Sequence, residues 1–464
     1  MILYDTLTGT KKELVPIAED GVIRLYVCGV TPYSESHVGH ALQAIVFDVL
    51  HRYLDWRKIP LKHVQNFTDI DDKLIDRSNR LGVSMADLAE ENIKAYLEQI
   101  RAMNVLPAHE YPRVTTMIPQ ILDFISGLIA KGFAYPAGGD VYYRVRKFGG
   151  AAYGALSKRD VDDLLSGARI DPTEIKEDPL DFALWKGAKP GEPSWDSPWG
   201  PGRPGWHIEC SAMSLHTLGE QIDIHGGGAD LIFPHHTNEI AQTEAYTGKS
   251  PFARIWMHNA LLQLGSEKMS KSIGNLVTIK EALESYGPDA LRIFLIGSHY
   301  RSPLSYSNEA LDAAKSGAER LRSAAFSEPV TTKKAEASAA PPTLDLAGVR
   351  ERFIKAMDDD LNTPQALACL FELARDANRL RDRGEDFSQA QVLLRELAGV
   401  LGLTLQAPVS GSQEAAPFID LLVALRSELR AAKQWALADR VRDGLTELGV
   451  ELKDGPEGTT WAAG

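Results

Sequence analysis

The sequence predicts an α/β fold, with a parallel sheet in the first part of the chain and a mostly α-helical second part. Two observations carry this prediction. Up to about residue 286, short apolar runs alternate with long helical patterns, which is the order that β-α-β units require. After that point helical periodicity continues almost throughout, and its breaks are stretches of small, polar and proline residues.

The first β-α-β unit begins with IRLYVC at residues 23–28, an apolar run of the length of a buried strand. Residues 37–56 then place apolar side chains on one face of a helix. A second apolar run, LKHVQNF at 61–67, ends in TDIDDK, and a long helical pattern opens at Ser84. Strands joined through a helix run parallel, so we expect both runs in one parallel sheet.

An insertion interrupts this order with one helix, a hairpin-like VYYRVRKF and a tract rich in Gly, Pro and Trp. Two stretches poor in apolar residues, at about 328–343 and 406–417, then have the composition of linkers. The expected domains are 1–113 and 205–285 for the two halves of the sheet domain, 114–204 for the connective insertion, 286–405 for the helical domain with its linker, and 418–464 for a small C-terminal domain.

The composition limits the function classes. A net charge of -13 argues against a protein that coats nucleic acid through bulk electrostatics, so an RNA partner would need a local basic face. Three widely spaced cysteines do not resemble a disulfide framework and fit a reducing compartment. No secretory signal and no uninterrupted apolar stretch of membrane-spanning length is visible, so we expect a cytoplasmic protein without a membrane partner.

The first chemistry-bearing motif is HVGH, between a predicted strand and a predicted helix. Helix N-termini at this edge of a parallel sheet offer free N–H groups to phosphates. His37 and His40 share one face of the first turn, and Gly39 leaves room for a nucleotide to approach the backbone. Surface or capping histidines are the alternative for this motif on its own.

The second motif is KMSKS, which places Lys268 and Lys271 on a loop between Gly265 and Gly274. Positioned cations suit a pyrophosphate leaving group, whose charge grows in the transition state. A solvated charged loop is the alternative. A Walker loop is absent, which argues against a P-loop ATPase.

A third group could bind zinc: Cys28, Cys210, and Glu239 with His235 or His236. His235 and Glu239 are four residues apart and would lie on one helical turn. Spacing alone leaves core cysteines as the alternative, and it does not decide between His235 and His236.

HVGH and KMSKS, in this order on a split parallel sheet, resemble the signature sequences of class I aminoacyl-tRNA synthetases. YVCGVT, NFTDIDDK, DPLDFALWK, GWHIECSAM, HGGGADLIFPHHTNE, MDDDLNTPQAL and KQWALADRVRDGL resemble the corresponding stretches of the cysteinyl-tRNA synthetase family, over nearly the whole chain. The resemblance implies a Rossmann-type catalytic domain with a connective insertion, a mostly α-helical domain and a small C-terminal anticodon-binding domain.

The resemblance also implies roles for individual residues. One zinc ion per chain would be bound by Cys28, Cys210, His235 and Glu239. ATP, with magnesium, would be bound by His37, Gly39, His40, Lys268 and Lys271, of which the two histidines and two lysines act in catalysis. The amino acid would be contacted by Gly29, Thr31, Thr68 and Trp206.

Some of these assignments have alternatives. The family usually has Gly-Pro-Thr after its first cysteine, whereas this chain has Gly29-Val30-Thr31-Pro32, so the loop backbone can differ locally. Trp206 could belong to the core, and Thr68 could cap the turn before Asp69, Asp71 and Asp72. Those aspartates fit a solvated loop better than a metal site, and His225 with the three following glycines suggests a close approach to adenosine.

Zinc has a physical reason in such a family. An apolar pocket separates near-isosteres by only about 1–3 kcal/mol, which is too little to distinguish cysteine from serine for translation. A thiolate binds zinc far better than a hydroxyl, so coordination of the substrate sulfur would supply the missing discrimination.

RNA contacts are expected in the C-terminal domain. Arg426, Arg430 and Lys433 follow a helical spacing, opposite Leu425 and Leu429. A solvated helix face is the alternative, and the resemblance favours a tail that reads the anticodon region.

The predicted function is ATP-dependent activation of L-cysteine to cysteinyl-adenylate and its transfer to the 3' end of tRNA(Cys), by a monomer. A paralogous ligase that passes cysteine to an amino sugar is the alternative enzyme, and it should lack the RNA-reading tail. A non-catalytic zinc and RNA binding protein is the alternative from another class, against which the intact HVGH and KMSKS argue.

Overall fold

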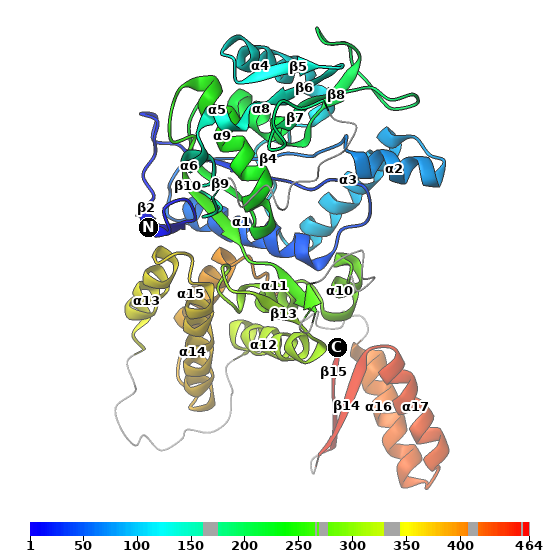
Figure 1. Ribbon diagram of the computed structural model, residues 1–464. Coiled ribbons are helices and arrows are strands. Elements are labelled where there is room, and N and C mark those ends of the chain that lie inside the picture. Colours follow the sequence, from blue (N-terminus) through cyan, green and yellow to red (C-terminus); the bar gives the residue numbers. More distant parts are fainter. Residues whose placement is uncertain are drawn as a thin grey trace.

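The computed structural model describes residues 1–160, 175–264, 267–268, 277–328, 344–406, 416–455 and 458–463. The sheet domain lies in the middle of the view in Figure 1, with the insertion above it, the helical domain below it and the C-terminal domain at the lower right. No helix in the described ranges is long and apolar enough to cross a membrane.

A parallel sheet in the order β10-β9-β3-β4 forms the centre of the first domain, as predicted. Helix α1 leads from β3 to β4, whereas β9 and β10 lie on the other side of β3. The strand order therefore reverses between β3 and β9, which is where ligands bind in sheets of this kind. The elements are β3 (Ile23–Val27), α1 (Val38–Trp56), β4 (Leu61–Gln65), β9 (Ile222–Gly228) and β10 (Ala253–Asn259).

The inner strands of this parallel sheet are almost completely buried, which is why their residues are largely apolar. All seven residues of β9 are buried, and four of the five in β3 are buried. Further elements surround the sheet: the hairpin β1 (Ile2–Asp5) and β2 (Thr10–Glu13), helices α2 (Asp72–Leu81), α3 (Met85–Ala102), α8 (Trp206–Leu218) and α9 (Thr237–Thr247), and the short turns η1 (Val114–Thr116), η3 (Ala229–Leu231) and η4 (Ile232–His236).

The insertion is built on an antiparallel sheet in the order β5-β6-β7-β8, backed by α4 (Ile118–Ala130). The expected hairpin in VYYRVRKF is wrong, because its second half turns into the short helix α5 (Val145–Phe148). The hairpin instead joins 134–137 to 140–143 through two glycines with positive φ. The strands are β5 (Ala134–Ala137), β6 (Asp140–Tyr143), β7 (Phe182–Gly187) and β8 (Gly202–Pro204), and α6 is Gly150–Tyr153.

The helical domain shares one continuous apolar core with the sheet domain. A small sheet formed by β11 (Leu262–Leu264), β12 (Glu267–Lys268) and β13 (Leu304–Tyr306) lies near the junction. The helices are α10 (Ile279–Tyr286), α11 (Pro288–Ile296), α12 (Asn308–Phe326), α13 (Leu346–Asp358), α14 (Thr363–Asp382) and α15 (Ser388–Val400).

Polar contacts also connect these two domains. The fully buried guanidinium of Arg292 in α11 forms an ion pair with Asp48 of α1 and donates to the carbonyls of Met103 and Leu401. Asp360, in the loop between α13 and α14, accepts from the backbone N–H of Tyr4 at 2.8 Å. The MDDDLNTPQAL stretch is therefore a junction between domains.

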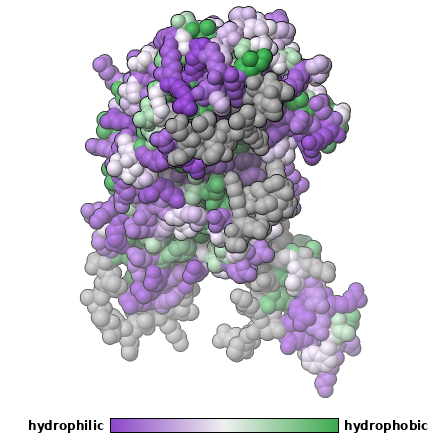
Figure 2. All heavy atoms as spheres, in the orientation of Figure 1, coloured by the Kyte–Doolittle hydropathy of each residue, from purple (hydrophilic) through white to green (hydrophobic). Residues whose placement is uncertain are grey.

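The C-terminal domain has its own small core, formed by Ile419, Val423, Leu445 and Val450. Its hairpin was not predicted from the sequence. Its elements are α16 (Ala416–Ala431), α17 (Trp435–Glu447), β14 (Val450–Gly455) and β15 (Gly458–Ala463). Large apolar side chains remain exposed here, among them Phe418 and Leu421, and Figure 2 shows hydrophobic residues over these helices.

Candidate active site

The HVGH motif forms the N-terminus of α1, where its two histidines cap the helix. His37 Nδ1 accepts from the backbone N–H of Gly39 at 3.1 Å, and the N–H of His37 donates to His40 Nδ1 at 3.3 Å. The two rings stack with centroids 3.9 Å apart. A Cβ on Gly39 would lie 2.9 Å from the His37 ring, so the ring would have to shift to admit any other residue.

The chain that follows the second motif lies beside the first. The backbone N–H of Val38 donates to the carbonyl of Val277 at 3.0 Å, and the N–H of Ile279 donates to the carbonyl of Ser36 at 3.1 Å. Lys268 lies in β12, opposite Gln263 of β11. Residue 271, the other predicted lysine, lies outside the described residues.

A pocket of about 410 Å³ opens between these segments and the end of β3. Its wall is formed by the N-terminus of α1 and by the loops after β9 and β10. These segments lie where the strand order of the sheet reverses. The lining includes Gly29, Thr31, His37, Gly39, His40, Trp206, Gly228 and Asn259. A larger pocket of about 830 Å³, between the sheet domain and the insertion, shares Thr31, Lys73 and Trp206 with it.

Four predicted metal ligands converge behind the pocket wall formed by Gly29 and Trp206. The ligand atoms of Cys28, Cys210, His235 and Glu239 all lie within 4.8 Å of one another, and all four residues are buried. The two sulfurs are 3.6 Å apart, Cys28 Sγ is 3.6 Å from Glu239 Oε1, and His235 Nε2 is 3.1 Å from the same oxygen. A tetrahedron with arms of about 2.0–2.3 Å has edges of about 3.3–3.8 Å, so this donor set fits zinc.

A second donor set overlaps the first. It shares Cys28 and Glu239 but uses His225 and His236. His236 Nε2 is 3.3 Å from Cys28 Sγ, while its Nδ1 is 2.8 Å from His258 Nε2. His225 Nε2 is 2.8 Å from Glu239 Oε2, the carboxylate oxygen that faces away from His235. The distances therefore leave both neighbouring histidines within reach of an ion.

Burial controls the charge states in this cluster. It raises the pKa of the Cys28 thiol well above its ordinary value, and nearby Cys210 and Glu239 add to the rise. It lowers the pKa of His235 well below its ordinary value, with His207 contributing. Burial also lowers the pKa of His207 and of His258 to about 3. These imidazoles are neutral at pH 7, which is the form that binds metal.

Comparison with known proteins assigns the family. A family model described as "tRNA synthetases class I (C) catalytic domain" matches residues 14–316, and a "DALR domain" model matches 352–406. The cysteine–tRNA ligase of Dehalococcoides mccartyi is 55% identical over 99% of both chains, and that of Pseudomonas aeruginosa is 51% identical over 99% of this chain and 98% of its own. The chain belongs to the cysteine–tRNA ligase family.

A solved structure agrees with this fold. Mycobacterium tuberculosis methionyl-tRNA synthetase in complex with methionyl-adenylate matches 87% of this chain and 94% of its own, with a TM-score of 0.61 at 16% identity. At that identity the likeness shows the fold alone, which is the class I fold predicted from HVGH and KMSKS.

Four residues were expected to contact the amino acid in this member of the cysteine–tRNA ligase family. Three of them line the pocket, and one is buried. Trp206 is 39% exposed, lines the pocket and stacks on His235 with ring centroids 4.3 Å apart, so the alternative of a core tryptophan is wrong. Gly29 and Thr31 also line the pocket. Thr68 is buried behind it, and its hydroxyl donates to Glu209 Oε2 at 3.2 Å.

The three aspartates after Thr68 have separate partners. Asp69 accepts from the backbone N–H of Thr115 at 3.0 Å, Asp71 caps α2, and Asp72 pairs with Lys186 at 2.8 Å. They form no metal-binding group among the described residues. The His225 side chain points at Glu239 and stacks on Trp256, while Gly228 lines the pocket, so the approach of this stretch to adenosine stays a prediction.

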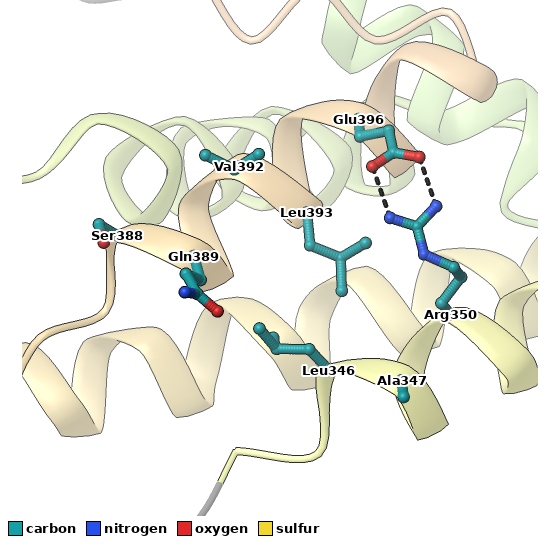
Figure 3. Close-up of a pocket in the computed structure, with 8 residues that line it drawn as sticks. All are labelled: Leu346, Ala347, Arg350, Ser388, Gln389, Val392, Leu393 and Glu396. Atoms are coloured by element: carbon teal, nitrogen blue, oxygen red, sulfur yellow. Dashed lines mark hydrogen bonds and ion pairs between the residues drawn. The ribbon is translucent and has the colours of Figure 1, made fainter.

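Another pocket lies far from this chemistry, between α13 and α15. Figure 3 shows that Arg350 and Glu396 face each other at one end of this space of about 360 Å³, and their two hydrogen bonds join them as an ion pair. Its only charged groups neutralise each other, and the other lining residues are apolar or carry an uncharged polar group.

The expected basic stripe on α16 needs correction. Arg426 is only 5% exposed and donates to Thr459 Oγ1 at 3.4 Å, whereas Leu425 is 42% exposed. The reason is the β14-β15 hairpin, which packs on the side of α16 that carries Val423 and Arg426. Arg430 and Lys433 are exposed.

Sequence reasoning missed three groups beside the candidate metal ligands, namely His207, His258 and Gln43. Gln43 Nε2 donates to the carbonyl of Cys28 at 2.5 Å, and His207 Nδ1 is 3.1 Å from His235 Nδ1. His207 lies three residues before Cys210, and Gln43 lies three residues after His40. These spacings were the one signal in the sequence that could have identified either residue.

Proposed function

We propose that the chain is a cysteine–tRNA ligase that activates L-cysteine with ATP and transfers it to tRNA(Cys). One observation carries the proposal: soft and borderline metal ligands from the end of β3, α8, η4 and α9 meet beside Gly29 and Trp206, which line a pocket that the HVGH helix terminus also lines. In the first step a carboxylate oxygen of cysteine attacks the α-phosphorus of ATP, and the bond to the departing pyrophosphate breaks. In the second step a ribose hydroxyl of the tRNA attacks the carbonyl, and AMP leaves.

The α1 terminus is the proposed ATP site. His37 and His40 hold their rings over the first turn, where Gly39 exposes the backbone, and the helix dipole favours phosphate there. Lys268 and Lys271 are proposed to stabilise the charge on the departing pyrophosphate, with magnesium on the nucleotide. Two backbone hydrogen bonds between residues 36–38 and 277–279 support this role. They hold the chain that follows the lysines beside the same helix terminus.

Cys28, Cys210, His235 and Glu239 are proposed to hold one zinc ion. This set is favoured over the one with His225 and His236 because it contains both thiols, and zinc prefers such soft ligands. When bound, zinc would supply a site that accepts a thiolate far better than a hydroxyl. Glu239 needs orientation for this role, and His225 provides it by binding the second carboxylate oxygen.

The amino-acid end of the pocket is formed by Gly29, Thr31 and Trp206. The Trp206 ring covers His235 and separates the donor cluster from the open part of the pocket. We propose that it excludes water from the side-chain subsite while the backbone atoms of the substrate extend toward the α1 terminus.

For tRNA we propose contacts at Arg430 and Lys433, which are exposed on the C-terminal domain. Arg426 is excluded as a direct contact because its side chain is buried against the hairpin. The two named relatives match across 99% of this chain, which includes this domain, and both carry the name of a tRNA ligase. The amino-sugar ligase therefore has no support, and we propose a monomer that acts in the cytoplasm.

Two assays test the function. The purified protein should exchange labelled pyrophosphate into ATP only with cysteine present, and it should then charge tRNA(Cys). Serine at the same concentration serves as the control substrate. Exchange that does not depend on cysteine would contradict the activation step, and activation without charging would contradict the tRNA step.

Metal content tests the zinc site. The wild-type protein should bind one zinc ion per chain. His235→Ala removes a ligand and should lose more zinc affinity than the about 10–100-fold that loss of an outer partner costs, whereas His236→Ala should keep more of it. The reverse order would assign the ion to His236.

A further inference from the structure

Three hydrogen bonds, two of them buried and one partly buried, form a continuous chain beside the donor cluster. The backbone N–H of Gly29 donates to Asn66 Oδ1 at 2.8 Å. Asn66 Nδ2 donates to Thr68 Oγ1 at 3.3 Å, and the Thr68 hydroxyl donates to Glu209 Oε2 at 3.2 Å. We call Asn66, Thr68 and Glu209 the bridging residues.

The ends of this chain are the sequence neighbours of the two thiols. Gly29 follows Cys28 at the end of β3, and Glu209 precedes Cys210 in the first turn of α8. Asn66 and Thr68 belong to the loop after β4. The two cysteines are 182 positions apart in the sequence, yet they are connected through these side chains over a short path.

The bridging residues are shielded from water, with exposed fractions of 1% for Asn66, 4% for Thr68 and 2% for Glu209. Among the described residues, Thr68 is the one that forms a hydrogen bond with the Glu209 carboxylate. A buried carboxylate without its donor would be left unsatisfied, so the Thr68 hydroxyl holds the first turn of α8 in place. On the other side, a Cβ on Gly29 would lie 1.7 Å from the carbonyl oxygen of Asn66, so the two loops are in close backbone contact.

We propose that the bridging residues are positioning residues that set the spacing of the Cys28 and Cys210 sulfurs for zinc. The inference rests on the proposed zinc centre and adds to it three residues that do not bind the ion themselves. Two thiolates at a separation of 3.6 Å bind one ion at once, and a shift of α8 relative to β3 would remove Cys210 from that position. The role differs from the substrate contact that resemblance implies for Thr68.

The test compares three variants by zinc affinity in the absence of cysteine and ATP. Thr68→Val removes the hydroxyl at nearly constant volume, and Thr68→Ser keeps it. Thr115→Val is the matched control, because it removes a hydroxyl that donates to Asp69, the neighbour of Thr68, without a connection to either cysteine. Zinc affinity is measured by competition with a chromogenic chelator, and the cobalt-substituted proteins report the thiolate ligands through their sulfur-to-metal absorption.

We expect Thr68→Val to lose about 10–100-fold in zinc affinity and to weaken the thiolate absorption, as is usual for groups that orient metal ligands. Thr68→Ser and Thr115→Val should stay within about threefold of wild type, since neither breaks the chain. If Thr68→Val binds zinc like wild type and only raises KM for cysteine, the hydroxyl is a substrate contact and the inference is overturned.

Two further measurements separate the possible failures. Wild-type protein without zinc would overturn the proposed metal centre and the inference together, whereas zinc in wild type with unchanged affinity in Thr68→Val overturns the inference alone. Circular dichroism establishes that each variant is folded. Should Thr68→Val fail to fold, Thr68→Ala leaves room for water and should show the same loss of zinc affinity, and normal affinity there would equally overturn the inference.

Discussion

At the scale of single residues, Gly39 has a steric reason to be glycine. Its missing Cβ leaves space for the His37 ring, which stacks on His40. The resemblance identified HVGH as a nucleotide motif, but it did not reveal that the two histidines are each other's caps. That information lies in the backbone path of the helix terminus, which a pattern of four letters does not contain.

Gly39→Ala should separate stability from activity. Alanine favours a helix over glycine by about 1 kcal/mol, so the free energy of unfolding should not fall. The His37 ring must move, however, and a small displacement of a positioning group costs about tenfold to hundredfold in rate. Pyrophosphate exchange at varied ATP concentration, with thermal unfolding in parallel, measures both effects. Unchanged exchange would show that the ring position is not important for ATP.

The candidate metal ligands illustrate what residue-level reasoning could predict. Their chemical types and the i, i+4 pair were visible in the sequence, and the structure brings all four together. The contacts behind them were not visible, because His225 of β9 and His258 of β10 lie on neighbouring strands, and His236 of η4 contacts both rings. The predicted RNA contact at Arg426 was wrong for a related reason, since the hairpin that buries this side chain was not predicted.

At the scale of elements, β4 is extended by a segment that the sequence did not predict as sheet. The backbone N–H of Gln65 donates to the carbonyl of Glu110 at 3.1 Å, and that of Phe67 donates to the carbonyl of Pro112 at 2.9 Å. His63 is buried here, next to the rings of His51 and His109. Both ring nitrogens of His63 lack a hydrogen-bond partner in the described chain.

This histidine group should make the edge of the sheet sensitive to acid. Burial lowers the pKa of His63 to about 3, with His51 and His109 adding to the effect. In the unfolded chain the imidazole binds a proton below about pH 6.5. Between these values the unfolded state holds more protons, so the free energy of unfolding should fall as the pH drops from about 6.5 and stop falling from this source near pH 3.

Urea unfolding between pH 7.5 and pH 4 measures this dependence. His63→Leu should flatten the slope relative to wild type, whereas His216→Leu, at an exposed position of α8, should leave it unchanged. Asp48, Asp55 and Arg52 also face His51, and they are retained in both variants. Equal slopes in wild type and His63→Leu would assign the acid sensitivity to other groups.

Element prediction succeeded where periodicity is long. The helices after residue 286 and the strands β3 and β4 follow from their apolar patterns, and the Gly and Pro tract correctly indicated an insertion. Short elements with alternating polar residues, such as β14 with VELKDG, carry no apolar run and were absorbed into a predicted helical region.

At the scale of the whole molecule, Arg292 connects the sheet domain to the helical domain. Its guanidinium is fully buried, pairs with Asp48 and donates to backbone carbonyls from two further segments. The resemblance implied a helical domain after the catalytic domain, but a buried ion pair between them could not be read from the pattern of an apolar helix such as PDALRIFLI.

Arg292→Met should destabilise the protein by about 1–3 kcal/mol, because buried backbone carbonyls lose their donor and the Asp48 carboxylate keeps only Arg52 as an ion-pair partner. Arg379→Met serves as the control, since Arg379 forms a surface pair with Asp376 whose loss should cost less than about 1 kcal/mol. Urea unfolding at pH 7 gives both values. Equal effects of the two substitutions would show that the connection through Arg292 does not contribute to stability.

The residues of the donor cluster lie far apart in the sequence, and this affects each molecule while it is being synthesised. Cys28 and Glu239 are separated by 211 positions. At a translation speed of about 5–20 residues per second, the first thiol emerges about 10–40 s before the last ligand. A nascent chain therefore passes through an interval in which peroxide or a stray ion can reach a sulfur that the finished protein encloses. The speed of the ribosome over this stretch sets how often that happens.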